Sequence, residues 1–124
     1  MRKLLIVMIG TCLAMGVSAQ QAPKAKKIEV VRLQKKINRN IQLVDVRTPK
    51  EYKEEHIGNA TNIDFNDTDF EVNVQKLNKN KRVYLYCRTG NRSAKAAEKM
   101  RALGFRKLYV LPVGMEGWKK EVSN

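Results

Sequence analysis

The segment Cys87-Arg88-Thr89-Gly90-Asn91-Arg92 separates an apolar run, Val83–Tyr86, from an alanine-rich stretch at residues 93–103. The apolar run predicts a strand in the middle of a parallel sheet, because it is aromatic and branched and apolar at every position. The alanine-rich stretch predicts a helix. A loop that passes from a strand into a helix start points several backbone N–H groups inward, where the helix dipole favours negative charge. The segment therefore predicts an anion-binding cradle.

Cys87 stands at the start of this cradle. The thiolate rather than the thiol is the nucleophile, and both the helix start and the two arginines of the loop favour ionisation. The plainer alternative is a buried cysteine that packs as a small hydrophobic side chain. Arg88, Arg92 and Gly90 favour the reactive interpretation, because together they suit a nucleophile that meets an anionic substrate.

The remaining pattern predicts strands that alternate with helices. The motif Thr48-Pro49-Lys50-Glu51 is a capping box with a proline start, and it predicts a helix that ends near His56. The other predicted helices lie near residues 30–37, before a turn at residues 38–40, and near 70–77, and the other strands lie at 41–46, 61–63 and 108–111. This order predicts an α/β fold, a small parallel sheet with helices on both faces. Ligands of such sheets bind at the carboxyl ends of strands, where Cys87 lies.

The amino-terminal segment has the three parts of a secretory signal peptide. Arg2 and Lys3 give a positive start, residues 4–17 are apolar but too short to span a bilayer, and Val17-Ser18-Ala19 is a small-x-small cleavage site. An uncleaved anchor and a lipid-modified Cys12 are the disfavoured alternatives. We therefore expect residues 1–19 to be removed and the protein to be exported to the bacterial periplasm, without stable membrane insertion after cleavage.

Removing residues 1–19 from the 124-residue chain leaves 105 residues, enough for one domain. We expect a flexible basic tail at residues 20–27 and the folded domain at 28–124. The net charge of +13 becomes +11 without Arg2 and Lys3, which would ordinarily raise nucleic acid as a partner. Export and the lack of a nucleic-acid motif argue against it. Much of the excess charge comes from dispersed lysines, which we expect to lie on a solvated surface: Lys24, Lys26, Lys27, Lys35 and Lys36.

Cysteine and histidine usage narrows the chemistry further. Cys12 leaves with the signal peptide, so Cys87 is the only cysteine of the mature chain and no internal disulfide can form. An unpaired thiol in an oxidising compartment indicates a reactive site or intermolecular pairing. His56 is the only histidine, and no second histidine or cysteine is placed to share a zinc ion. We expect neither a metal nor a cofactor.

Four motifs, in order along the mature chain, resemble the rhodanese family. They are Asp45-Val46-Arg47 with Glu51-Tyr52, the segment His56-Ile57-Gly58-Asn59-Ala60-Thr61-Asn62-Ile63, the Cys87 to Arg92 loop, and Gly117-Trp118. The likeness is greatest to small exported single-domain rhodaneses, including the phage-shock type. It implies a rhodanese-like domain with thiosulfate sulfurtransferase activity. In that chemistry Cys87 accepts a sulfur atom from a small anionic donor as a persulfide and passes it to cyanide, a thiol or a protein thiol.

The resemblance also suggests roles for individual residues. Arg92 is expected to curl back over the bound anion, since its fork of donors suits oxyanions. Ser93, where the loop meets the helix, is expected to cap the helix or to assist the thiolate. Arg88 is predicted either to bind the anion or to point to solvent. The full set expected to bind the anion is Arg88, Thr89, Gly90, Asn91, Arg92 and Ser93.

Two residues outside the loop are candidates for a supporting role. Asp45 falls at a strand end near the pocket in this family, but aspartate is also common in turns, and we favour a structural role. Arg47 and Glu51 have the spacing of an i, i+4 pair, which contributes about 0.3 to 0.5 kcal/mol when exposed. The chain departs from the family pattern at Pro112-Val113-Gly114-Met115, which replaces the usual glycine pair and concerns one wall of the pocket.

Two other functions use a similar framework. A cysteine phosphatase or arsenate reductase has five residues between its cysteine and arginine, whereas four separate Cys87 from Arg92. The shorter loop predicts a tighter ring of N–H groups, suited to a transferred sulfur, and no aspartic general acid is identifiable. A catalytically silent rhodanese-like binding module is the other alternative. The presence of Cys87 argues against it, because loss of the cysteine is the usual mark of such modules.

Overall fold

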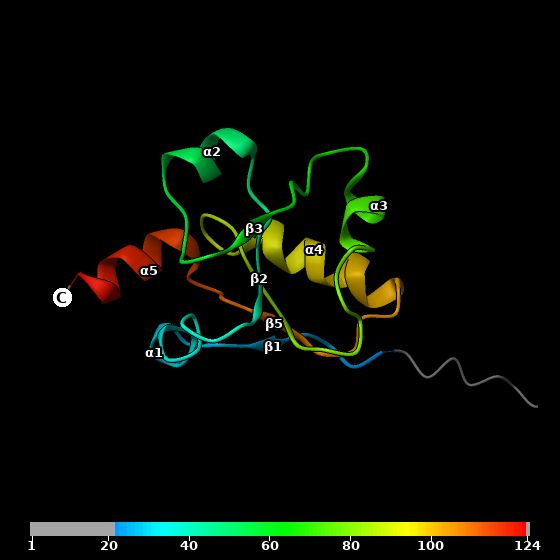
Figure 1. Cartoon of the computed structure of the whole chain (residues 1–124), viewed down its shortest axis with the longest axis horizontal. Helices are drawn as coiled ribbons and strands as arrows, with labels where there is room; N and C mark the ends of the chain where they lie inside the picture. The colour runs from blue at the N-terminus through cyan, green and yellow to red at the C-terminus, as the bar shows by residue number, and fades with distance from the viewer. Residues whose placement is uncertain (1–21, 124) are drawn as a thin grey trace, which may run out of the picture.

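The computed structural model describes residues 22–123, so the expected signal peptide and the first two residues of the expected tail lie outside the described residues. Five strands form one sheet in the order β1-β5-β4-β2-β3, and every neighbouring pair is parallel (Figure 1). The strands are β1 (Lys26–Lys27), β2 (Gln42–Asp45), β3 (Thr61–Asn62), β4 (Val83–Tyr86) and β5 (Leu108–Val110). The predicted small parallel sheet is confirmed.

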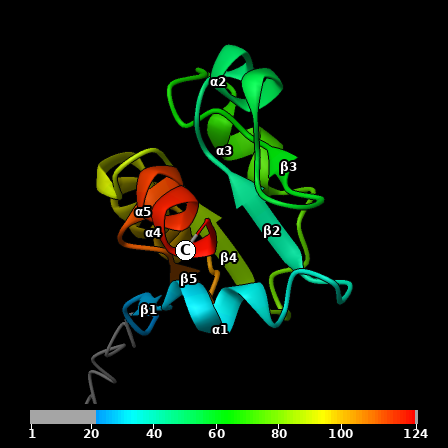
Figure 2. The ribbon, with the colours of Figure 1, turned by 90° about the vertical axis from the view of Figure 1, so that its left-hand side faces the viewer.

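Helices cover both faces of this sheet. They are α1 (Val30–Gln34), α2 (Pro49–Glu54), α3 (Phe70–Val74), α4 (Asn91–Ala102) and α5 (Gly114–Val122). Val83, Leu85 and Cys87 face a core cluster that includes buried residues of α3 and α4. The alternate residues of β4, Tyr84 and Tyr86, face a second cluster that includes residues of α1 and α5. Figure 1 shows α1 and α5 on the left and α3 and α4 on the right, and Figure 2 shows α1 at the bottom and α3 near the top.

The start of α2 confirms the predicted capping box. The Thr48 side chain accepts a hydrogen bond from the Glu51 N–H at 3.3 Å, and a Glu51 carboxylate oxygen accepts from the Thr48 N–H at 3.4 Å. Pro49 occupies the first helical position, where its missing N–H leaves no helix bond unmade. The capping box fixes where the chain leaves β2 and places the carboxylate of Glu51 at the amino-terminal end of α2.

Three elements differ from the sequence-based expectation. Lys26–Lys27, expected in the flexible tail, form β1, because their backbone groups pair with Tyr109 and Val110 of β5 while both side chains stay exposed. Strand pairing uses the backbone, so a polar sequence does not prevent it. The first helix ends at Gln34, about one turn before the expected exit at residues 38–40, and turns follow it. The helix α5 was not predicted.

Trp118 on α5 is only 8% exposed and belongs to the core cluster with α1. Phe105 is buried near Met100, after the left-handed Gly104 that ends the α4 segment.

Within residues 22–123, no helix combines the length and the apolar character needed to cross a bilayer.

Candidate active site

Cys87 directly follows β4, at the carboxyl end of the central strand, and is 1% exposed. Two backbone N–H groups of the following loop donate hydrogen bonds to its sulfur, from Gly90 at 3.1 Å and from Ser93 at 3.4 Å. The Ser93 hydroxyl lies 3.4 Å from the same sulfur and donates to the Gly90 carbonyl at 3.1 Å. Backbone N–H groups of the loop therefore point inward, and the Cys87 sulfur lies among them.

Burial opposes ionisation of the Cys87 thiol and by itself would raise its pKa. The hydrogen bond between the Cys87 sulfur and the Ser93 side chain, with those from the N–H groups of Ser93, Gly90 and Thr89, outweighs burial, so the pKa of Cys87 lies below its ordinary value. The thiolate is thus stabilised mainly by neutral donors at short range. Such donors cannot be screened by salt in the way that a distant charge can.

The first turn of α5 supports the loop from behind. The N–H groups of Met115 and Glu116 donate to the carbonyls of Cys87 at 2.8 Å and of Arg88 at 3.2 Å. Gly114 has a φ of 60°, and a Cβ there would collide with those two carbonyl groups. Within the segment Pro112-Val113-Gly114-Met115, one glycine is therefore required for the close approach of backbone to backbone.

Gly90 shows the same constraint on the other side of the loop. Its φ is 99°, in the left-handed region, and a Cβ would meet the backbone of Pro112. It is also the N-cap residue of α4, and no side chain caps that helix. The glycine lets the loop turn sharply enough for its own N–H to reach the Cys87 sulfur.

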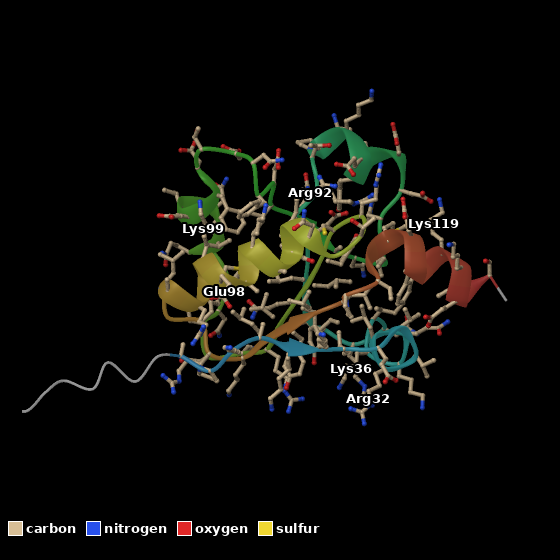
Figure 3. The ribbon with its side chains drawn as sticks, turned by 180° about the vertical axis from the view of Figure 1, so that it is seen from behind. Arg32, Lys36, Arg92, Glu98, Lys99 and Lys119 are labelled. Carbon is tan, nitrogen blue, oxygen red and sulfur yellow. The ribbon has the colours of Figure 1, made fainter. Side chains whose placement is uncertain are left out.

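Arg92 does not lie free over the cradle. Its two terminal nitrogens donate to the two carboxylate oxygens of Glu51, at 2.6 and 3.0 Å, in a fork-to-fork ion pair. The hydrogen bond from Arg92 is the main reason why the pKa of Glu51 falls to about 2 from an ordinary 4.5. Figure 3 shows Arg92 at the end of α4 nearest α2. Glu51 therefore joins the capping box of α2 to the cysteine loop.

Arg88 follows the solvent-exposed alternative of its two predicted positions. Its side chain is 64% exposed and pairs with Glu116 at 3.4 Å. Thr89 and Asn91 are also exposed residues of the loop. Both arginines that were expected to drive ionisation of Cys87 are thus engaged by carboxylates, and the hydrogen-bond donors of the loop have the larger effect.

Asp45 and Arg47 form a buried ion pair of 2.7 Å. Arg47 also donates to the carbonyl of Glu55 at 2.7 Å, and its backbone N–H bonds Asp45 at 2.9 Å. The suggested pairing of Arg47 with Glu51 is wrong, because Arg47 precedes the N-cap of α2 and the i, i+4 rule applies only within a helix. The role of these two residues is to hold the β2–α2 connection, as the structural interpretation of Asp45 predicted.

In the part of the chain that the structure describes, no group of three or more His, Cys, Asp or Glu side chains is arranged to hold a metal ion. His56 stacks on Tyr52 with ring centroids 3.9 Å apart, and one ring nitrogen lies 2.9 Å from the Tyr52 carbonyl oxygen. Its surroundings are those of a helix-end side chain.

The geometry agrees with comparison to known proteins. A model of the rhodanese-like domain matches residues 29–121. The chain belongs to the rhodanese family. It is 36% identical over 81 residues to the thiosulfate sulfurtransferase GlpE of Coxiella burnetii, an alignment that covers 65% of this chain and 74% of that one. A rhodanese-like domain protein of Staphylococcus aureus is similar in structure, with a TM-score of 0.68 and 34% identity over 75% of this chain and 90% of its own.

Some relatives are longer than this rhodanese. The chain is 29% identical over 103 residues to the Bacillus subtilis protein YrkF, covering 82% of this chain but only 55% of YrkF. Rhodanese-family membership and the relatives' sulfur chemistry support sulfur transfer in general terms.

Two parts of the site went unrecognised in the sequence. Glu51 was identified as a capping residue, and its pairing with Arg92, 41 positions away, has no local signal. The support of the loop by Gly114 and Met115 was also missed, although the departure from the rhodanese pattern drew attention to that segment. A glycine directly after Pro112-Val113 was the one available sign of a close backbone approach.

Proposed function

We propose that this protein is a thiosulfate sulfurtransferase in which Cys87 carries the transferred sulfur. The observation that carries the proposal is the buried Cys87 sulfur, bonded by the N–H groups of Gly90 and Ser93 in a loop of a rhodanese-family chain. The likeness to a thiosulfate sulfurtransferase supports the choice of donor. Because the hydrogen-bond donors of the loop favour the thiolate, Cys87 can act as a nucleophile without a separate general base.

The reaction that fits this site has two steps. The Cys87 thiolate attacks the outer sulfur of thiosulfate, a new S–S bond forms, and the original S–S bond breaks so that sulfite leaves with the bonding electron pair. A cyanide ion or a thiolate then attacks the outer sulfur of the persulfide. The Cys87 thiolate is regenerated, and thiocyanate or an acceptor persulfide leaves.

The loop residues divide this work. The N–H groups of Gly90 and Ser93 hold negative charge on the sulfur in both steps, because they already point at it. Arg92 binds the sulfonate oxygens of the donor. Since Glu51 holds the same guanidinium, the incoming anion shares Arg92 with Glu51 or displaces it. This competition also favours release of sulfite after the first step.

The length of the loop favours sulfur over phosphorus. Four residues between Cys87 and Arg92 leave the cradle filled by the cysteine sulfur and the donors around it. A tetrahedral oxyanion attacked at its centre needs a wider ring. Parallel assays on one preparation test this: we expect thiocyanate formation from thiosulfate and cyanide, and no turnover of aryl phosphates or arsenate. Phosphate release without thiocyanate formation would reverse the assignment.

Intact-mass measurement tests the carrier directly. Thiosulfate should add one sulfur atom to the protein, and cyanide should remove it. A protein that binds thiosulfate but never gains this mass would be a binding module rather than a transferase.

We also propose that the chain is exported to the periplasm as a small phage-shock-type rhodanese. Support comes from the positive start, apolar centre and small-x-small site of residues 1–19. Expression in a bacterial host followed by cell fractionation tests it. The periplasmic fraction should hold a chain that begins at Gln20 and contains Cys87 as its only cysteine. An intact amino terminus in the cytoplasmic fraction would refute export.

A further inference from the structure

A groove lies at the amino-terminal ends of the strands, whereas Cys87 lies at their carboxyl ends. The groove has a volume of about 350 Å³, and its lining residues lie before or at the start of β2, β4 and β5. Five cationic residues line it: Lys36, Arg39, Lys81, Arg82 and Lys107. We call these five residues and the cavity between them the basic groove. Figure 3 shows Lys36 at the lower edge of the molecule, far from Arg92.

The positive charge of the basic groove is uncompensated. No aspartate or glutamate is among its lining residues, and none of its five cations belongs to an ion pair within residues 22–123. The other lining residues are amides, Ile41 and Tyr84. A concave surface lined by charges of one sign concentrates the field inside it and attracts ligands of the opposite sign.

The walls of the basic groove are fixed by side-chain hydrogen bonds. The Gln42 amide donates to the Asn78 carbonyl at 3.0 Å, and its oxygen accepts from the Asn78 N–H at 2.7 Å. This reciprocal pair fastens the loop before β4 to the start of β2. The concavity is therefore built into the meeting point of two strands.

Two of the cations are held in place by contacts that leave their charge free. Lys107 donates to the Asn80 carbonyl at 3.1 Å. The Arg82 guanidinium lies 5.9 Å from the centre of the Tyr109 ring, which stacks on Tyr84. Positioned cations lose less conformational freedom when a ligand binds, so their attraction is less offset by ordering.

We propose that the basic groove binds an acidic, extended segment of a partner protein. A polypeptide in extended form advances by about 3.3 Å per residue, so successive carboxylates can enter a cavity of this size and meet cations from several segments. A flat bilayer or a duplex would instead contact side chains that project from a convex surface. The groove lies at the opposite sheet edge from Cys87, so an occupied groove leaves the cysteine loop open. The proposal is independent of the sulfur chemistry.

Fluorescence anisotropy of a labelled oligoglutamate peptide tests the proposal. The charge-reversed variant Lys36→Glu/Arg39→Glu/Lys107→Glu should bind the peptide at least about tenfold more weakly, and the affinity of the unaltered protein should fall as salt is added. The matched control is Lys53→Glu/Lys95→Glu/Lys120→Glu, which has the same change of net charge at three exposed lysines outside the basic groove. This control should lose much less affinity.

The outcomes separate the groove from bulk charge. Equal loss of affinity in the two variants would show that net charge alone attracts the peptide, and would overturn the proposal. Groove-dependent binding that is tighter to anionic phospholipid vesicles, or to duplex DNA, than to the peptide would overturn a polypeptide as the occupant. Circular dichroism monitors folding. If the charge-reversed variant is unfolded, the neutral variant Lys36→Gln/Arg39→Gln/Lys107→Gln takes its place in the binding test. Unchanged peptide affinity in the folded neutral variant would also refute the proposal.

Discussion

The two ends of the sheet treat positive charge in opposite ways. The three arginines that follow β2 and β4 at the carboxyl end are each paired with a carboxylate: Arg47 with Asp45, Arg88 with Glu116 and Arg92 with Glu51. At the amino-terminal end, the basic groove gathers five cations with no ion pair among the described residues. The net charge of +13 is therefore a poor guide to where the chemistry occurs.

The difference shows what each end can do. The lowered pKa of Cys87 depends on neutral donors within hydrogen-bond distance, which are specific in direction and buried from salt. Attraction at the basic groove depends on charge that is exposed, long in range and sensitive to salt. Variants at the carboxyl end should therefore change rates and pKa values, and variants at the amino-terminal end should change association.

The largest expected effect is loss of the sulfur carrier. Cys87→Ala should lower thiocyanate formation by at least about a thousandfold, because no second thiol lies beside it among the described residues. The variant should also fail to gain sulfur on exposure to thiosulfate, as measured by intact mass. Lys81→Ala in the basic groove is the control for the opposite end and should leave turnover unchanged. Sulfur uptake by the Cys87→Ala protein would place the carrier elsewhere.

A smaller loss is expected when the arginine fork is removed. Arg92→Ala should reduce kcat/KM for thiosulfate by about ten- to a hundredfold, and Arg92→Lys should recover only part of it, because lysine keeps the charge but not the two parallel donors. Steady-state kinetics of the two variants measure this difference. Full turnover in the alanine variant would mean that Arg92 serves only its ion pair with Glu51.

Two glycines with positive φ distinguish the effect of close packing behind the loop from the effect of backbone strain alone. Gly114→Ala should lower the free energy of unfolding by about 2 to 4 kcal/mol, from backbone strain and collision with the Cys87 and Arg88 carbonyls. Gly104→Ala has a similarly positive φ of 98° but no atom within 4 Å, so it should lose only about 1 kcal/mol. Denaturant unfolding measures both. Equal losses would show that backbone strain, and not the close approach, explains the requirement for glycine.

The sequence predicted those features that depend on local or periodic patterns. Short apolar runs located β2, β4 and β5, and the box from Thr48 to Glu51 located the start of α2. The order of strands and helices then predicted the parallel sheet and placed Cys87 at its carboxyl end. Each of these inferences uses residues that are neighbours in sequence.

The remaining features depend on contacts between distant segments. The pairing of Arg92 with Glu51 and of β1 with β5 joins residues far apart in the chain, so neither has a local pattern. The helix α5 was obscured by Gly114 and Gly117, whose presence reflects close packing at that site. The basic groove is likewise assembled from three separate segments, residues 36–42, residues 80–84 and Lys107, each of which looks in sequence like an ordinary solvated surface.

Removing the carboxylate that holds Arg92 should have a moderate effect. Glu51→Gln should lower stability by about 1 kcal/mol at neutral pH, whereas Glu116→Gln at the exposed pair should lose roughly 0.3 kcal/mol or less. The folded pKa of Glu51 is depressed to about 2 from 4.5, so its contribution is present above pH 4.5 and is lost as the pH falls towards 2. Thermal unfolding across that range should show the two curves converging. Because glutamine can also complete the capping box, a difference that stays constant with pH would show that the loss does not depend on the charge of Glu51, and would contradict its assignment to the ion pair with Arg92.

The smallest expected effect is a change in the ionisation of the thiol. Ser93→Ala removes the hydroxyl near the Cys87 sulfur but keeps the Ser93 N–H donor, so the pKa of Cys87 should rise towards its ordinary value without reaching it. Following iodoacetamide alkylation of the persulfide-free protein against pH gives the midpoint. Because the donors are neutral and buried, added salt should leave this midpoint nearly unchanged while it weakens peptide binding at the basic groove. A midpoint that rises steeply with salt would mean that exposed charge, and not the N–H groups of the loop, stabilises the thiolate. Exposed charge would then determine the properties of both ends of the sheet.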